Sequence, residues 1–351
     1  MKNVKNICLI LGVFFILSLS CLGTEVKQQQ TYVSKIIINA PWGQRNADMD
    51  REPSPSGEFG IYDPYTRDPK AFDEGPVTGP STFTVASNGD IYIVDTFNHR
   101  IQKFNQEGSF VAAFPAVGSG WAEDVAVDAN GNIYLLFLGP AQVWKSDQGG
   151  NRLKIIQTFN RYENRDDEDV RGMDTHGGST RLYCDNTGRL FLTYYKENER
   201  AQVIFQLGTT TAEFTPEQQK ATLRRGYAGM SGIILNKDQI FQYIDGKMFT
   251  VDNSDKAITG YNFSGTYSFL DVDGSGNAYM TYYNMDTDIY SVKKQTPDGK
   301  IISTFEWKFT NYAHHNLNKP LTIDAQGNVY VFDSTKNGIT ITKWSTSGGG
   351  K

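Results

Sequence analysis

The sequence predicts an all-β protein built from a repeated four-stranded unit, and three observations support this fold class. Aromatic residues make up 13% of the 351 residues, with 19 Tyr and 21 Phe, and aromatic side chains suit the half-buried surface of a strand. The chain also has 34 Gly, which suits many tight turns. In addition, one pattern recurs along the chain: an apolar strand, a glycine turn and a second strand rich in aromatics.

The clearest copy of this pattern reads NGDIYIVDTFNHRIQKFNQEG, at residues 88–108. Five more copies follow, the third of them without the turn glycine: NGNIYLLFL (130–138), NTGRLFLTY (186–194), KDQIFQYIDG (237–246), SGNAYMTYY (275–283) and QGNVYVFD (326–333). The six turns lie 38 to 57 residues apart, close to the period of propeller blades.

Each copy predicts four antiparallel strands in chain order. An apolar strand such as FTVAS or VAVDA precedes the turn, and strands such as RIQKF and SFVAAF follow the aromatic one. Glycine allows the positive φ that a tight hairpin needs. A lone four-stranded sheet cannot cover both of its faces, so the units must pack radially around an axis. The sequence therefore predicts a six-bladed β-propeller of four-stranded antiparallel blades.

The last unit lacks a fourth strand after ITITKW, and the segment TYVSKIIINA at residues 31–40 has no partner of its own. We expect this N-terminal strand to complete the last blade, because closing the ring removes an exposed edge that would invite aggregation. The predicted propeller domain spans residues 31–345, and residues 346–351 form a flexible tail.

The N-terminus carries an export signal. Residues 1–20 contain two lysines, an apolar run and small residues, as in a secretory signal peptide. Cys21 follows directly and resembles the lipidated cysteine of a bacterial lipobox, although Ser18 stands where that motif prefers an aliphatic residue. Residues 21–30 would form the tether. The alternatives are a lipid-anchored protein of the bacterial cell envelope and a soluble periplasmic or secreted one.

Residues 95–114, DTFNHRIQKFNQEGSFVAAF, resemble the NHL repeat at Asn98-His99-Arg100-Ile101. The resemblance implies a six-bladed propeller of the exported bacterial type. We interpret His99 as a turn residue packed between blades. The net charge is −5, so the chain lacks the basic surface that nucleic-acid binding requires.

The sequence predicts no metal and no other cofactor. The stretch at 271–277 begins like a calcium loop, but Tyr282 stands where an EF-hand needs a glutamate, and we interpret the stretch as a turn. Four consecutive acids at 166–169 are expected to be solvated. His176 and the pair at 314–315 are too scattered for a shared site. No catalytic motif of the nucleophile-elbow or phosphate-loop type is present.

The blade pattern resembles that of propeller enzymes whose active sites lie at one end of the central channel, where the first strands begin. Peptide-amidating lyases hold zinc with histidines at the start of first strands, and the corresponding positions here carry no histidine: Ser81, Glu123, Thr180, Ser231, Ser268 and Lys319. A three-histidine zinc site is therefore excluded. Gluconolactonase-like propellers use Glu, Asn and Asp around a cation, and only Glu123 matches in kind. These positions could still bind a polar ligand.

Long insertions at 41–79, 160–178, 209–228 and 308–318 are predicted to join fourth strands to the next first strands, on one face. Within the third, Thr215, Pro216 and Gln218 predict a capped helix that ends at Gly226.

Aromatic and arginine side chains in and beside these insertions are candidate contacts for a partner, since such residues often dominate binding. They include Trp42, Trp121, Arg161 and Arg165, although the aromatics could instead anchor the loops.

Two functions remain open. The leading hypothesis is a monomeric, non-catalytic binding module for a protein, peptide or glycan. The alternative is a lyase or lactonase that uses Glu123 and Lys319 as an acid/base pair at the channel mouth. The sequence does not identify the ligand or the membrane leaflet.

Overall fold

A computed structural model gives the structure of the chain. It describes the following residues: 31–45, 54–64, 76–116, 122–137, 142–157, 181–184, 188–196, 201–209, 212, 214–222, 224–227, 233–236, 239–244, 247–250, 253–258, 268–284, 286–310, 312–313 and 319–347.

The described strands form five four-stranded sheets and one five-stranded sheet. In the four-stranded sheets the strands pair antiparallel in chain order, as the repeat predicts. Four of these sheets comprise β3 (Thr82–Val85), β4 (Ile91–Asp95), β5 (Arg100–Phe104), β6 (Phe110–Pro115); β7 (Asp124–Val127), β8 (Ile133–Phe137), β9 (Gln142–Ser146), β10 (Arg152–Gln157); β15 (Ile233–Asn236), β16 (Gln239–Ile244), β17 (Lys247–Thr250), β18 (Asn253–Ile258); β19 (Ser268–Val272), β20 (Ala278–Asn284), β21 (Ile289–Gln295), β22 (Ile301–Lys308).

The remaining four-stranded sheet and the five-stranded sheet hold the other strands. They comprise β11 (Arg181–Cys184), β12 (Arg189–Lys196), β13 (Ala201–Thr209), β14 (Arg224–Tyr227); and β2 (Phe59–Ile61), β1 (Tyr32–Arg45), β25 (Gly338–Thr346), β24 (Val329–Thr335), β23 (Leu321–Ile323).

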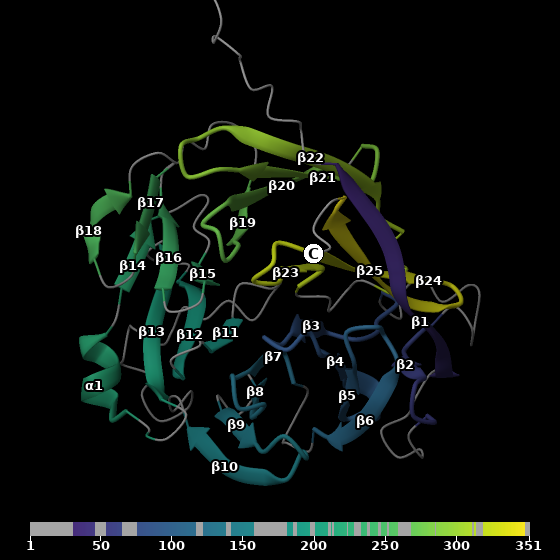
Figure 1. The fold of residues 1–351 in the computed structure, drawn as a ribbon. Helices are drawn as coiled ribbons and strands as arrows, with labels where there is room; N and C mark the ends of the chain where they lie inside the picture. Colours follow the sequence, from purple (N-terminus) through teal and green to yellow (C-terminus); the bar gives the residue numbers. More distant parts are fainter. Residues whose placement is uncertain are drawn as a thin grey trace, which may run out of the picture.

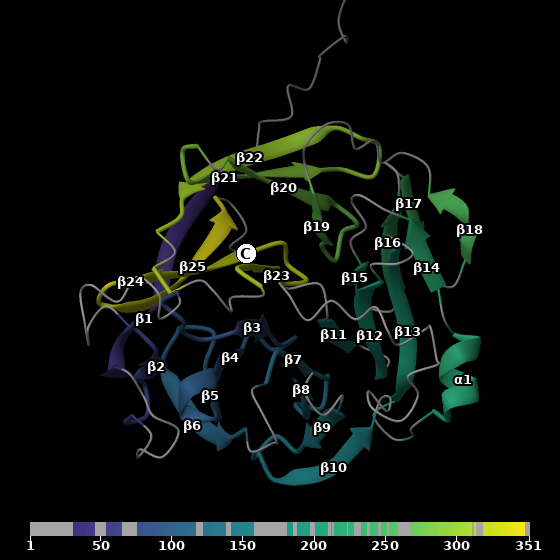
Figure 2. The same cartoon turned by 180° about the vertical axis from the view of Figure 1, so that it is seen from behind.

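The sheets stand around a central axis, with the first strand of each repeat innermost (Figure 1). The view from behind shows the same ring, with β6, β10, β18 and β22 at its rim (Figure 2). The inner strands contact one another in a closed circle, β3 to β7, β11, β15, β19, β23 and back to β3. The chain is therefore a β-propeller of small antiparallel sheets.

The N-terminal strand β1 joins the C-terminal sheet, which confirms the predicted pairing of residues 31–40. It pairs antiparallel with β25 from Tyr32 opposite Thr346 to Pro41 opposite Gly338, with a bulge between Ile36 and Ile38. The strand is longer than predicted and continues to Arg45. Its far end adds β2 in parallel, which the sequence pattern did not predict.

One hydrogen-bond geometry recurs within the chain and explains its repeated turns of the form Asp-x-x-Gly-Asn-x-Tyr. Asp128 Oδ1 accepts hydrogen bonds from the amides of Asn130 and Asn132, and its Oδ2 lies 3.2 Å from the hydroxyl of Tyr134. The same bonds recur at Asp273 and Asp324. The turn interpretation of residues 271–277 is thus confirmed.

The core lies between neighbouring sheets rather than in one layer. Tyr92 and Val94 of β4, for example, share a buried cluster with Val125 of β7 and Leu135 of β8. Ile91 and Ile93 of the same strand share another buried cluster with Tyr330 and Phe332 of the C-terminal sheet. The first sheet thereby buries both faces against its neighbours, which a single four-stranded sheet cannot do alone.

The helix α1 (Pro216–Ala221) has the predicted capping box. The Thr215 amide donates to Gln218 Oε1 at 2.8 Å, and the Gln218 amide donates to Thr215 Oγ1 at 3.3 Å. Two expectations for this region were wrong. Gly226 lies in β14, not at the end of the helix, and β14 is a fourth strand paired with β13, so α1 connects third to fourth strand. The sequence RRGY lacks apolar alternation, which hid this strand.

Candidate functional site

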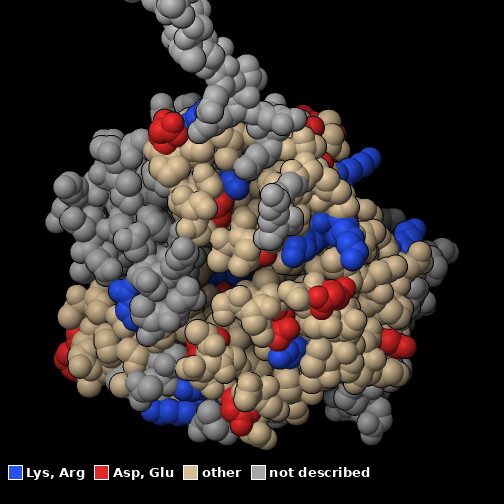
Figure 3. Space-filling model, viewed as in Figure 1, with Lys and Arg blue, Asp and Glu red and all other residues tan. Residues whose placement is uncertain are grey.

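A cavity of about 440 Å³ runs along the axis of the propeller. Its walls are residues of the inner strands β3, β7, β11, β19 and β23, joined by residues of β20 and β21. At β11 the lining extends from Arg181, the first residue of the strand, to Cys184, the last. Figure 3 shows a hollow at the centre of the ring, with charged side chains around it. The cavity volume of about 440 Å³ lies in the range of roughly 300–1,000 Å³ that is typical of small-ligand sites.

Two cations, Arg181 and Lys319, line this cavity, and no Asp or Glu is among its described lining residues. The rest of the lining is mainly aliphatic and hydroxyl-bearing. Thr281 is one of the hydroxyl residues, and its Oγ1 is buried without a hydrogen-bond partner in the described structure. A buried polar atom without a partner costs roughly 1–3 kcal/mol, so this hydroxyl is a site where a bound polar group would be stabilised.

A buried carboxylate fixes the inner strands on one side of this cavity. Asp124, at the start of β7, is fully buried. Its Oδ1 accepts from Thr82 Oγ1 on β3 at 3.1 Å, and its Oδ2 accepts from the Leu182 amide on β11 at 2.8 Å. These contacts place the beginnings of three inner strands side by side. Arg181, next to Leu182, is therefore held at this end of the cavity.

The six positions predicted at the starts of the first strands differ in whether they line the cavity. Ser81 is buried and its hydroxyl donates to the Ala122 carbonyl at 2.9 Å, so it serves packing between sheets. Lys319 lines the cavity, whereas Glu123 is not among the lining residues. Ser268 is the first residue of β19. The two remaining positions, Thr180 and Ser231, lie outside the described residues.

Among the candidate partner-binding residues, only Trp42 is described. It is buried, and its Nε1 donates to the Thr335 carbonyl at 2.8 Å, so Trp42 anchors β1 to the end of β24. Trp121, Arg161, Arg165 and the proposed lipidation site Cys21 lie outside the described residues. In the described part of the chain, no helix is long and apolar enough to cross a membrane.

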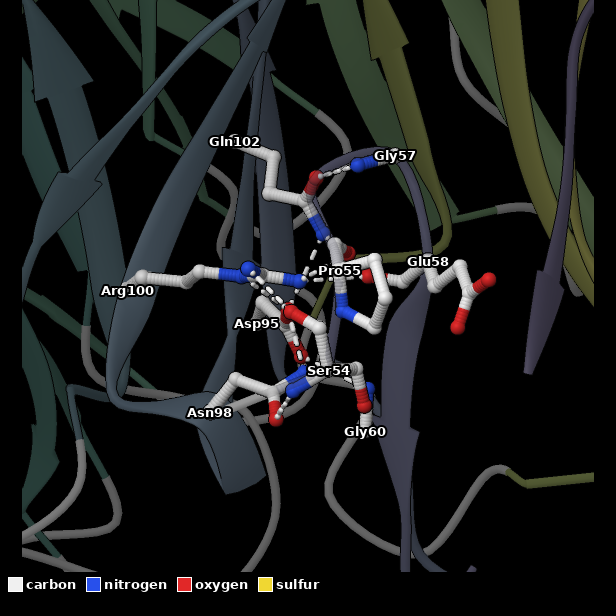
Figure 4. Close-up of polar contacts among 9 residues, drawn as sticks. All are labelled: Ser54, Pro55, Gly57, Glu58, Gly60, Asp95, Asn98, Arg100 and Gln102. Carbon is white, nitrogen blue, oxygen red and sulfur yellow. Dashed lines mark hydrogen bonds and ion pairs between the residues drawn. The ribbon is translucent and has the colours of Figure 1, made fainter. Parts of the chain in front are cut away.

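A second polar cluster lies between the first sheet and the segment of residues 54–60, around Asp95 at the end of β4 (Figure 4). Asp95 is fully buried, and its Oδ2 accepts hydrogen bonds from Asn98, Arg100 and Gln102 at 2.8, 2.8 and 2.9 Å. Its Oδ1 accepts from the Gly60 amide at 2.9 Å. Burial raises the pKa of the Asp95 carboxyl, while these donors pull the pKa in the opposite direction.

The donors around Asp95 grip the backbone of residues 54–60. Arg100 donates to the carbonyls of Ser54, Pro55 and Glu58, and Asn98 accepts from the Ser54 amide. Gln102 adds a bond to the Glu58 carbonyl and accepts one from the Gly57 amide. Because nearly all of these contacts are to main-chain atoms, the cluster fixes the path of the segment that leads into β2 (Figure 4).

The described residues bring together no group of three His, Cys, Asp or Glu side chains that could hold a metal ion. Asp273, in the stretch that begins like a calcium loop, instead forms an ion pair of 2.9 Å with Lys294. The acids at 166–169 and the histidines at 176, 314 and 315 lie outside the described residues.

Comparison with known families identifies the segment that contains the Asp95 cluster. Residues 78–104 match the model of the NHL repeat. This segment is similar to an NHL repeat. It spans β3, β4 and β5, and the NHL-repeat positions Asn98 and Arg100 are those that bind Asp95. His99 adopts a left-handed conformation (φ 48°) after a 3₁₀ turn at Thr96–Asn98, in agreement with its interpretation as a turn residue.

No curated protein matches the chain. Among solved structures, a streptogramin B lyase is 13% identical and has a TM-score of 0.43, covering 90% of this chain and 98% of its own. Virginiamycin B lyase from Staphylococcus aureus is 12% identical with a TM-score of 0.43, covering 76% and 95%. The WD40 repeats of RRP9 are 10% identical with a TM-score of 0.48, covering 76% and 94%. Likenesses at this level carry no functional inference.

Proposed function

We propose that this chain is an exported, lipid-anchored propeller of the bacterial cell envelope that binds a protein, peptide or glycan partner at its central cavity. The observation that carries the proposal is the cavity of about 440 Å³, which several inner strands line together with Arg181 and Lys319. A concave site with a few polar groups among apolar walls is the usual form of a binding site.

We propose further that each of the six sheets is one blade. The support is the closed circle of contacts between the six inner strands and the four strands, or five with β2, in each sheet. Export and anchoring are supported by the apolar run within residues 1–20 and by Cys21 directly after it.

The site can be tested by filling the cavity. Thr84 lines it from β3, and Thr84→Tyr would place a phenol ring in the cavity. Thr304→Tyr is the matched control, because Thr304 is exposed on β22 and is not among the lining residues. We expect wild type and Thr304→Tyr to capture the same envelope component from an extract, and Thr84→Tyr to lose it at an unchanged melting temperature. Equal capture by all three proteins would exclude the cavity as the partner site.

The alternative activity, a lyase or lactonase with Glu123 and Lys319 as an acid/base pair, is not favoured by a specific observation. Lys319 lines the cavity but Glu123 is not among its lining residues.

A further inference from the structure

We infer that the central cavity binds a small anionic organic molecule, or an anionic end group of a larger one, held between Arg181 and Lys319. The inference rests on the proposed function and specifies the ligand class for the same cavity.

The first argument is the placement of the two cations. Arg181 begins β11, and Lys319 stands two residues before β23. In the circle of inner strands, β11 and β23 are separated by two strands on either side, so they stand on opposite sides of the axis. Since both side chains line the same cavity, they flank it from opposite walls.

The second argument is the chemistry of the lining. A guanidinium presents several N–H donors in a fixed fork that fits a carboxylate or a phosphate, and an ammonium adds a compact positive charge. The described lining residues contribute these two cations and no carboxylate. Both cations also interact with other residues of the chain.

The third argument concerns the uncharged part of the ligand. Leu182, Leu270 and Leu321 line the same cavity and offer apolar contact, and Tyr290 adds a ring that stacks on Trp307 at 4.9 Å. The unpartnered Thr281 hydroxyl offers one further hydrogen bond. A molecule with an anionic group, a polar group and an apolar body matches this combination.

The experiment uses probes that differ only in charge, titrated into the protein by calorimetry. Glucuronate and glucose 6-phosphate carry an anion on a sugar, and glucose is their neutral counterpart. N-acetylalanine, an anion, and N-acetylalaninamide, which is neutral, form the same comparison on an amino acid. We expect at least one anionic probe to bind, its neutral counterpart to bind at least about tenfold more weakly, and added salt to weaken binding. The probe that binds distinguishes a carboxylate from a phosphate and a sugar from a peptide source.

The variants Arg181→Gln and Lys319→Gln should each weaken the binding probe about tenfold or more. Lys300→Gln makes the same change of charge in the exposed turn between β21 and β22 and should leave binding unchanged. If Arg181→Gln does not fold, Arg181→Lys keeps the charge without the fork and should bind with reduced affinity. Equal affinity for charged and neutral probes, binding that survives both glutamine substitutions, or no binding of any anionic probe at 10 mM would overturn the inference.

The two proposals can fail separately. If the anionic probes do not bind but Thr84→Tyr abolishes capture of the envelope component, the cavity is the partner site and the ligand is not anionic. If the probes bind through Arg181 and Lys319 but Thr84→Tyr leaves capture unchanged, the anion site stands and the proposed partner site is wrong.

Discussion

The carboxylate of Asp124 accepts a hydrogen bond of 2.8 Å from the backbone amide of Leu182, on the neighbouring inner strand. Its other oxygen accepts from Thr82 on the opposite side, so one side chain links three consecutive sheets. Because Asp124 is fully buried, water cannot replace these contacts.

We therefore expect Asp124→Ala to lower the free energy of unfolding by at least ~2 kcal/mol, because it deprives the buried Thr82 hydroxyl and Leu182 amide of their acceptor. Urea denaturation measures the loss. Asp286→Ala removes an exposed carboxylate between β20 and β21 and should change little. An Asp124→Ala protein as stable as Asp286→Ala would show that the inner strands hold together without this carboxylate.

The Arg100 guanidinium holds both Asp95 and three carbonyls of residues 54–58. Arg100→Met would leave a buried carboxylate without its cation, and removing one partner of such a pair typically costs ~3–5 kcal/mol. We also expect faster hydrogen exchange at the Gly60 amide, which donates to Asp95. Arg100→Lys keeps the charge but not the forked guanidinium, so its stability and its exchange rate at Gly60 should lie between those of wild type and Arg100→Met. Unchanged protection at Gly60 would mean that residues 54–60 hold their path by packing alone.

Asp273 predicts a pH dependence of stability. Burial raises the pKa of this carboxyl, but hydrogen bonds from Asn277 and the contact with Lys294 outweigh it, so the pKa lies below its ordinary value. A carboxyl with a lower pKa in the folded than in the unfolded state adds stability above the unfolded pKa, and this stability is lost as the pH falls through the folded pKa. Asp273→Asn should thus be less stable than wild type at pH 7, and the difference should shrink below about pH 4.

Unfolding by urea at a series of pH values tests this expectation. A difference between wild type and Asp273→Asn that stays constant from neutral to acidic pH would show that the carboxylate charge plays no part.

The closing strand should be essential. A chain that starts at Ala47 lacks β1 and leaves the edge of β25 unpaired, so we expect it to aggregate. Tyr32→Phe is a milder test: the Tyr32 hydroxyl lies 3.2 Å from that of Tyr279, and burial raises the pKa of Tyr32 to about 12. Loss of this hydroxyl should cost ~1 kcal/mol. Light scattering and thermal unfolding measure both effects, and a truncated protein that melts like the whole chain would contradict the role of β1.

The proposed anchor predicts a change in fractionation. Cys21→Ala removes the only residue that could carry the lipid at the end of the apolar run, so the protein should move from the membrane fraction to the soluble one. Mass spectrometry of the mature N-terminus is the direct measurement. An unmodified Cys21 on a soluble wild-type protein would support simple secretion instead.

The repeat predicted much of the architecture because it is dictated by local chemistry. The Asp-x-x-Gly-Asn-x-Tyr turns bind their own amides, and the aromatic strand after each turn follows from its composition. The pairing of residues 31–40 was predictable for another reason, since an unpaired strand and an incomplete sheet occur at opposite ends of the chain. By contrast, β14 was missed because Arg224-Arg-Gly-Tyr227 shows no alternation.

The residues that line the cavity were harder to predict from the sequence than the fold. Lys319 was found by counting from each first strand, but the same count at β11 pointed to Thr180, one residue before Arg181. Thr281 and Tyr290 could not be found in this way, because they lie on the second and third strands of their sheet. For Trp42 the sequence predicted a partner contact, because tryptophan is common at interfaces. In the structure its side chain instead holds β1 in place.

The order of synthesis gives the β1–β25 pairing a kinetic meaning. Tyr32 is made more than 300 residues before its partner Thr346, which at ribosomal rates of ~5–20 residues per second corresponds to a delay on the order of 15–60 seconds. Throughout that interval the stretch of β1 that pairs with β25 lacks this partner, although its far end can already pair with β2. The ring can therefore close only after the C-terminal strand has been synthesised. Because this pairing joins the residues most distant in sequence, we expect it to limit the folding rate.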